Sequence, residues 1–189
     1  MSVLKERPAC PSEVVGAVIE LVRAAFVAGN MPPAVDSDDL EQVIDALHVL
    51  RPACAEFAFF DGWLLLWRED WERAEETFRG LVAREVCMPA SKGMLLQCMR
   101  ARDVFGWQDD ARRLADEHGD DDIGRLAKTF LAKDDLKRAV AAAHRTGRFI
   151  APESALVLEN ADKTRDADTL PASSQSAGDL LATMQYMRI

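Results

Sequence analysis

The sequence predicts an all-α fold of stacked helical hairpins followed by a flexible C-terminal tail. Along several segments, apolar residues recur at steps of three and four, which is the spacing of one face of a helix. The chain of 189 residues has one tyrosine and almost no alternation of Val, Ile and Thr, which argues against a sheet-rich fold. Its 49% hydrophobic and 29% charged residues are typical of a globular protein. We expect a helical repeat domain over residues 13–150, between a disordered lead (1–12) and a mostly disordered tail (151–189).

Residues 57–81 contain the clearest predicted hairpin. The segment from Phe57 to Trp67 has one charged residue, so as a helix it must be buried on several sides. The next helix has Asp70 as its expected N-cap. Its apolar stripe is Trp71, Ala74, Phe78 and Leu81, opposite a charged face. We expect Ala74 to lie between the helices, in a core that includes Trp63, Leu66, Trp71, Ala74 and Phe78.

This hairpin resembles one tetratricopeptide-type repeat. Small Gly62 is placed where the two helices would touch, and the stripe that begins at Trp71 alternates large and small residues. The motif is degenerate, because the usual proline after the second helix comes late, at Pro89. The same stripe occurs 31 residues earlier, at Leu40, Val43, Leu47 and Leu50. A near-34-residue period predicts two hairpins, roughly 13–51 and 55–85, stacked as a TPR-like superhelical repeat.

The first hairpin has clear start and stop signals. Its first helix is expected to have Ser12 as N-cap and to end at Gly29-Asn30. Its second helix begins near Ser37 with acidic residues, which suit the positive end of the helix dipole, and Pro52 terminates it.

Later helices are shorter or less apolar. One helix face is predicted at Met94, Leu95, Cys98 and Met99, and a short helix runs from Trp107 to His118. Asp120 to Asp122 are expected to cap the next helix. Asp134-Asp135 are expected to begin a separate helix, Leu136 to His144, which ends at Gly147 and covers the end of the stack.

The tail has no periodicity over residues 160–179, which indicates a flexible linker. A short terminal amphipathic helix follows, with the stripe Leu180, Leu181, Met184 and Met187. It is either an interaction motif or a poorly ordered end.

Composition also limits location and partners. The net charge of −9 disfavours nucleic acid and anionic membranes, and favours a protein partner with basic patches. The cysteines (Cys10, Cys54, Cys87 and Cys98) form no C-x-x-C pair. We expect Cys54, Cys87 and Cys98 to be reduced and buried, although a disulfide stays open. With no secretion signal and no membrane span, the expected location is the bacterial or cellular cytoplasm.

No catalytic or metal-binding motif occurs in the sequence. His48, His118 and His144 have no partner at motif spacing, and we interpret His48 as a satisfied residue at the edge of the core. The acidic cluster from Asp116 to Asp122 lacks the spacing of an EF-hand, so we interpret it as helix capping. Phosphate-binding glycine loops and hydrolase motifs are also missing. We therefore expect no cofactor, no metal and no enzymatic activity.

Three stretches resemble the HrpK-type family of bacterial type III secretion proteins. They are Ile44–Pro52 (IDALHVLRP), Phe60–Leu65 (FDGWLL) with Trp71–Ala74 (WERA), and Pro89–Leu95 (PASKGML). The helix from Trp107 to Glu117 also fits, so the similarity covers roughly residues 13–132. The resemblance implies small repeat-like accessory proteins that have no catalytic residues and are similar in architecture to YscG-type chaperones of needle subunits.

The sequence therefore predicts a non-enzymatic, chaperone-like accessory protein of type III secretion. We expect its repeat groove to bind an amphipathic segment of a needle, rod or pilus subunit. The partner-binding residues are unknown, and the candidates are exposed side chains between Glu13 and Arg23, Glu56 and Asp61, and Lys92 and Arg102. The tail beyond Asp162 is expected to be dispensable. The resemblance also implies an alternative, a structural component of the secretion system that is envelope-associated, either periplasmic or in contact with the cell wall. A helical-repeat scaffold or homodimer is a further alternative.

Overall fold

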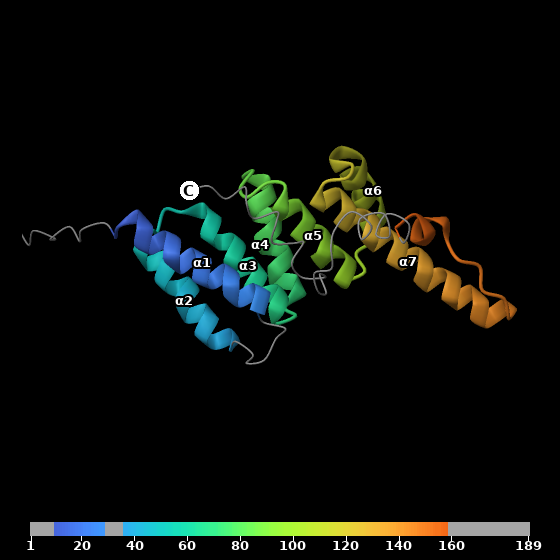
Figure 1. The fold of residues 1–189 in the computed structure, drawn as a ribbon, viewed down its shortest axis with the longest axis horizontal. Coiled ribbons are helices and arrows are strands. Elements are labelled where there is room, and N and C mark those ends of the chain that lie inside the picture. The colour runs from blue at the N-terminus through green and yellow to red at the C-terminus, as the bar shows by residue number, and fades with distance from the viewer. Residues whose placement is uncertain (1–9, 29–35, 159–189) are drawn as a thin grey trace, which may run out of the picture. The chain divides into compact units, whose positions relative to one another are not determined.

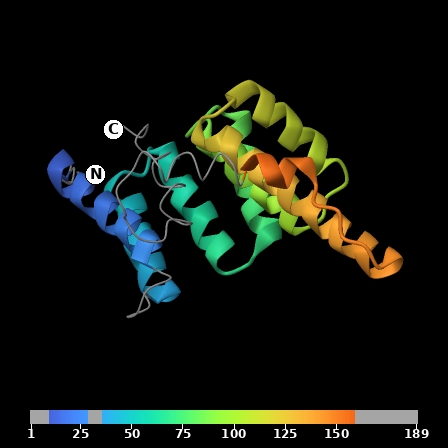
Figure 2. The same ribbon diagram turned by 45° about the vertical axis from the view of Figure 1, so that its right-hand side comes forward.

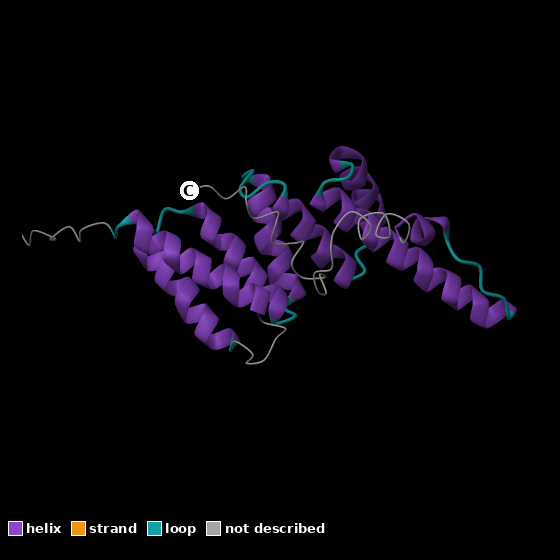
Figure 3. Cartoon of the chain, viewed as in Figure 1, coloured by secondary structure: helices purple, strands orange, loops and turns teal. Residues whose placement is uncertain are grey.

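The computed structural model describes residues 10–28 and 36–158, and within these ranges every regular element is helical (Figures 1 and 3). This confirms the predicted all-α class. The chain divides into two compact units at Val86/Cys87, and we describe each unit by itself. Of the predicted lead and tail, only residues 10–12 and 151–158 are described, and the predicted terminal helix lies outside the described residues. The helices are α1 (Ser12–Ala28), α2 (Ser37–Leu50), the 3-10 turn η1 (Ala55–Phe57), α3 (Ala58–Trp67), α4 (Trp71–Ala83), α5 (Ala90–Ala101), α6 (Trp107–His118) and α7 (Asp122–Thr146).

The first unit consists of the two predicted hairpins. α1 packs on α2, α2 on α3, and α3 on α4, so helices that are neighbours in the sequence also pack on one another (Figure 2). Its largest fully buried side chains include Phe57, Phe59, Phe60 and Phe78. The hairpin boundaries predicted from Pro52 and from the polar break at residues 68–70 are confirmed, because α2 ends at Leu50 and α3 at Trp67.

A very close contact joins α3 and α4 at Gly62. A Cβ atom added at Gly62 would lie 2.7 Å from Cζ of Phe78, so glycine is required for this approach. Ala74, one turn before Phe78, is fully buried, as predicted. Leu66 and Phe78 are also buried, but Trp63 and Trp71 are only half-buried. Part of each indole is therefore at the surface, and for these two residues the predicted core was wrong.

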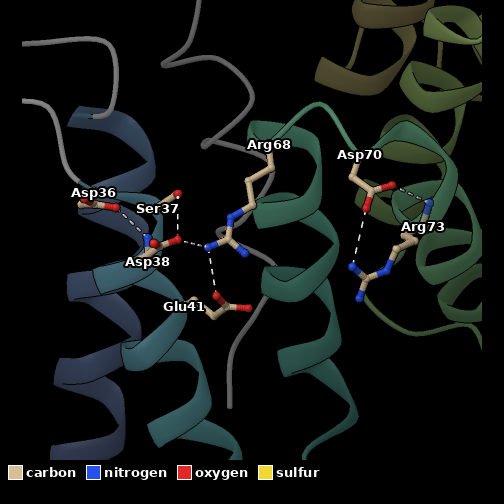
Figure 4. A network of polar contacts seen from close by, with 7 residues as sticks. All are labelled: Asp36, Ser37, Asp38, Glu41, Arg68, Asp70 and Arg73. Atoms are coloured by element: carbon tan, nitrogen blue, oxygen red, sulfur yellow. Dashed lines mark hydrogen bonds and ion pairs between the residues drawn. The ribbon is translucent and has the colours of Figure 1, made fainter.

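Side-chain caps begin several of the helices. The carboxylate of Asp70 accepts a hydrogen bond from the Arg73 N–H at 3.3 Å, which confirms the predicted N-cap of α4 (Figure 4). Asp36 caps α2 in the same way, through the Asp38 N–H at 2.8 Å (Figure 4). Ser12, in contrast, is already the first residue of α1, and the first free N–H groups bond to the Pro11 carbonyl. The prediction of Ser12 as N-cap was wrong.

The second unit packs α5, α6 and α7 together. Its core cluster includes residues from all three helices: Leu96, Trp107, Ala111, Leu114, Ala115, Ile123, Ala127 and Phe130. Gly93 allows a close contact here too, because an added Cβ would lie 2.9 Å from Cδ1 of Ile123. Asp121 accepts a hydrogen bond from the Gly124 N–H at 2.8 Å, so the acidic cluster caps α7 as predicted.

α7 is one helix of 25 residues and is not interrupted at Asp134-Asp135. The sequence between Leu131 and Leu136 contains no glycine or proline to break it. Both carboxylates form ion pairs with Arg138, one turn later, and such pairs stabilise a continuing helix. The prediction of a second helix that begins at Asp134 was therefore wrong, whereas its end at Gly147, which has a positive φ of 72°, is confirmed.

The contact at Gly62 makes a paired prediction about stability. Gly62→Ala should destabilise the protein by about 1–3 kcal/mol, because the new methyl group overpacks against the buried Phe78 ring. Gly80→Ala is the matched control: it lies on α4 with nothing within 4 Å of the added Cβ. There, removal of a flexible glycine should stabilise the protein by about 0.5–1 kcal/mol. Urea unfolding followed by circular dichroism measures both, and equal stability of the two variants would contradict the assigned contact.

Candidate functional site

α1 presents a second apolar stripe to solvent. Val14 and Leu21 are 48% and 59% exposed, and Ala17 and Ala24 on the same face are exposed as well. Because helical residues are about 100° apart, these four side chains fall within an arc of about 80°. The buried side chains of α1 are Val15, Val22 and Phe26. Their arc is centred about 140° from the exposed one. We call Val14, Ala17, Leu21 and Ala24 the α1 stripe.

The opposite face of α1 is held by aromatic contacts with α3. Phe26 stacks on Trp63 with 4.1 Å between ring centroids and 7° between ring planes. Phe26 also contacts Phe60, at 6.5 Å, and Trp67, at 5.6 Å with the rings tilted by 49°. Such aromatic pairs each contribute about 0.5–1.5 kcal/mol beyond their buried area. The aromatic residues thus fix the orientation of α1, and the exposed stripe is a defined surface.

Polar pairs hold α2 against α3 at both ends. Nε2 of His48 lies 2.9 Å from Oδ2 of Asp61, which confirms the interpretation of His48 as a satisfied residue at the core's edge. At the other end, Nη2 of Arg68 donates to Asp38 at 2.6 Å and to Glu41 at 2.9 Å (Figure 4). The hydrogen bond to Arg68, and then its charge, lower the pKa of Glu41 from its ordinary value. Because the two contacts join opposite ends of the helices, α2 and α3 run antiparallel.

The other two candidate segments offer little exposed surface. Between Glu56 and Asp61, three phenylalanines are buried and the remaining side chains are half-buried. Both carboxylates there have internal partners, since Glu56 accepts from the Cys54 thiol at 3.0 Å and Asp61 pairs with His48. Between Lys92 and Arg102, only the last two side chains are exposed. The segment from Glu13 to Arg23 is therefore the candidate that displays exposed apolar side chains.

One polar contact in the second unit was not predicted. The guanidinium of Arg100 lies over the Phe130 ring, 4.2 Å from its centroid. Burial lowers the pKa of Arg100, opposed by the charge of Asp134. This contact packs α5 on α7, and no sequence motif marks a cation–π pair between residues 30 positions apart.

The acidic charge is concentrated in the first unit. Its described residues, 10–28 and 36–86, contain fifteen acidic and six basic side chains, a net charge of −9. Residues 87–158 contain eleven acidic and twelve basic side chains, a net charge of +1. Glu13 and Glu20 are exposed beside the α1 stripe, and Glu20 is paired with Arg23 at 3.0 Å. The stripe therefore lies on a unit that attracts basic partners.

In the described residues, the cysteines and the acidic cluster are not arranged as a metal site. None of the four cysteines is in a disulfide. Cys98 is buried, as predicted, whereas Cys54 and Cys87 are half-buried, so for these two residues the predicted burial was wrong. His118 pairs with Asp121 at 2.8 Å. Within residues 10–28 and 36–158, no three His, Cys, Asp or Glu side chains gather as a metal site would require.

Fold and site together define the class: an all-α protein of helical hairpins that presents an apolar helix face on an acidic unit. Comparison with known families gives a match to most of the chain. The model of the family described as bacterial type III secretion protein (HrpB1_HrpK) matches residues 6–136, and the chain belongs to this family. The match covers α1 to α6 and the first part of α7. No curated protein and no solved structure matches the chain. In the part of the chain that the structure describes, no helix is both long and apolar enough to cross a bilayer.

Cys54 provides a test of the local structure beside α3. Burial first, and then the hydrogen bond and charge of Glu56, raise the pKa of the Cys54 thiol to about 11. The reactive thiolate should therefore be scarce, and at pH 8 Cys54 should react with iodoacetamide about a hundredfold more slowly than in urea. Glu56→Gln should restore only part of the reactivity, because burial remains. Peptide mass spectrometry gives the rates, and a Cys54 that reacts equally fast folded and unfolded would contradict the buried pair.

Proposed function

We propose that the chain is a non-enzymatic, chaperone-like accessory protein that binds an amphipathic helix of a secretion subunit on the α1 stripe. The observation that supports this most is the second apolar face of α1. A helix that packs on one side needs an apolar arc of roughly 100°. With Ile19 included, apolar side chains cover an arc of about 220° around α1. This arc is wide enough for α1 to pack on α2 and α3 and to bind a further helix on its exposed part.

The shape of the stripe suits a helical ligand. Val14, Ala17, Leu21 and Ala24 are spaced by three, four and three residues. Large and small side chains alternate along this row, so that a facing helix can place large side chains over the alanines. Docking of an amphipathic helix into an apolar groove is one of the common modes of peptide recognition.

The net charge of the first unit favours a partner that has basic residues beside its apolar face. The first unit has a net charge of −9, and Glu13 and Glu20 lie exposed at the edge of the stripe. Basic residues beside the partner's apolar face would speed the encounter and disfavour acidic competitors. Needle, rod and pilus subunits of the same secretion system are the partners we propose, in the bacterial cytoplasm before assembly. Covering their apolar segments would prevent premature self-association.

The test is capture of co-expressed needle, rod or pilus subunits by the full-length protein and its variants. Val14→Asp should weaken binding by about tenfold to a hundredfold, since a charge replaces one of the two large apolar side chains of the stripe. Val49→Asp is the matched control: Val49 is 72% exposed on α2 in the same unit but lies outside the stripe. It should leave binding unchanged.

Other outcomes separate this proposal from its alternatives. The full-length protein with Met184→Asp should still capture the subunit. Loss of capture by this variant would place the contact in the terminal stripe. If no subunit is captured and the native protein fractionates with envelope material, an envelope-associated structural role replaces the chaperone. A homodimer that dissociates on Val14→Asp, with no subunit bound, would make the α1 stripe a self-association surface.

A further inference from the structure

The second half of α7 has no buried residue. All buried side chains of α7 lie between Ile123 and Ala132. The remaining residues, 133–146, continue the helix for about 21 Å, and Figures 1 and 2 show this half extending past α6. Leu136 and Val140, one turn apart, are 40% and 41% exposed. Most helices in proteins draw their stability from tertiary packing, so a packing partner for this half is expected.

The segment after α7 adds more exposed apolar side chains. Phe149 and Ile150 follow the end of the helix, and the short helical stretch 153–158 turns back along it (Figure 2). Ser154 donates a hydrogen bond to Asp135 at 2.6 Å, which holds this stretch beside α7. Exposed apolar residues of this region are Leu136, Val140, Phe149, Ile150, Leu156 and Val157, at 40–66% exposure. We call them the α7 patch.

We propose that the C-terminal stripe of the same chain, Leu180, Leu181, Met184 and Met187, folds back and covers the α7 patch. Apolar side chains left exposed on one part of a protein mark interaction surfaces. Leu136 is the last residue of the family match, and the other five residues of the patch lie beyond it. The terminal stripe is the one remaining apolar segment beyond Leu158 with helical spacing.

The length of the chain favours this occupant over a second molecule. The described chain ends at Leu158, next to Val157 of the patch. Residues 159–179, most of which the sequence predicts to be a flexible linker, would then have a root-mean-square span of about 25 Å, close to the length of the exposed half of α7. A tether of this kind gives an effective concentration on the order of millimolar. A second copy at micromolar concentration would be outcompeted.

Charge is complementary between the two segments. Residues 133–148 contain five basic and two acidic side chains, a net charge of +3. Residues 159–189 contain five acidic and three basic side chains, a net charge of −2. Opposite charges favour the folded-back arrangement, and more so at low salt.

Hydrogen exchange of the full-length protein tests this contact. In the unaltered chain, amides of residues 136–146 should be protected, and Met184→Asp or Val140→Asp should remove that protection. Ala182→Asp is the control on the predicted opposite face of the terminal stripe, and Ala141→Asp is the control on an exposed position of α7. Both controls should keep the protection, and the mass in solution should be that of one chain.

Two other results would contradict the proposal, and each has its own readout. Equal exchange in all five proteins would overturn the proposal, because the patch would then have no internal cover. Protection that grows with protein concentration, together with a doubled mass, would identify a second copy as the occupant. These readouts concern α7 alone, so they stand or fall separately from binding of a secretion subunit at α1.

Discussion

The stack of Phe26 on Trp63 is the contact on which the first unit depends. α1 packs on α2, and its Phe26 ring reaches α3 through this stack, with 4.1 Å between the ring centroids. The neighbouring Trp67 and Phe60 rings surround the same phenylalanine. Because one face of α1 is fixed in this way, its other apolar face cannot turn inward to bury itself. The exposed α1 stripe is therefore a consequence of the packing and not of a loosely attached helix.

The two units differ in the surface that they present. The first unit combines an apolar helix face with a net charge of −9, while the described part of the second unit has a net charge of +1. Polar contacts in the first unit are used for structure: Arg68 bridges two carboxylates of α2, and His48 bonds Asp61. The exposed acidic residues of this unit would attract a basic partner without fixing its position. Specificity would then come from the fit of large and small side chains along α1.

Helical periodicity predicted most of the fold. The steps of three and four residues located both hairpins, and the small size of Gly62 and Ala74 correctly indicated where α3 and α4 approach. The local sequence pattern gave a wrong prediction where the burial of a side chain depends on a residue far away in the sequence. Trp63 was expected in the core, but its ring stacks on Phe26, 37 positions earlier, and stays half-exposed. Asp134 and Asp135 suggested a helix start, because an N-cap and an i,i+4 ion pair use the same side chains.

The site was predicted only in part. The segment from Glu13 to Arg23 was among the candidates and contains three of the four α1 stripe residues. The segment from Glu56 to Asp61 was wrongly expected to offer exposed side chains, since its acids bond to Cys54 and His48 and its phenylalanines are buried. A sequence shows that a helix is apolar over a wide arc, but it does not show which part of that arc its neighbours cover.

Site-specific photocross-linking in the bacterium tests the central claim most directly. A photoreactive amino acid would replace Leu21 in one full-length protein and Val49 in another, because both side chains are exposed on the same unit. Cross-linking from position 21, and not from position 49, to a subunit of the secretion system is the predicted result. Equal cross-linking from both positions, or none from position 21 while the subunit still co-purifies, would contradict the assignment of the α1 stripe as the binding surface.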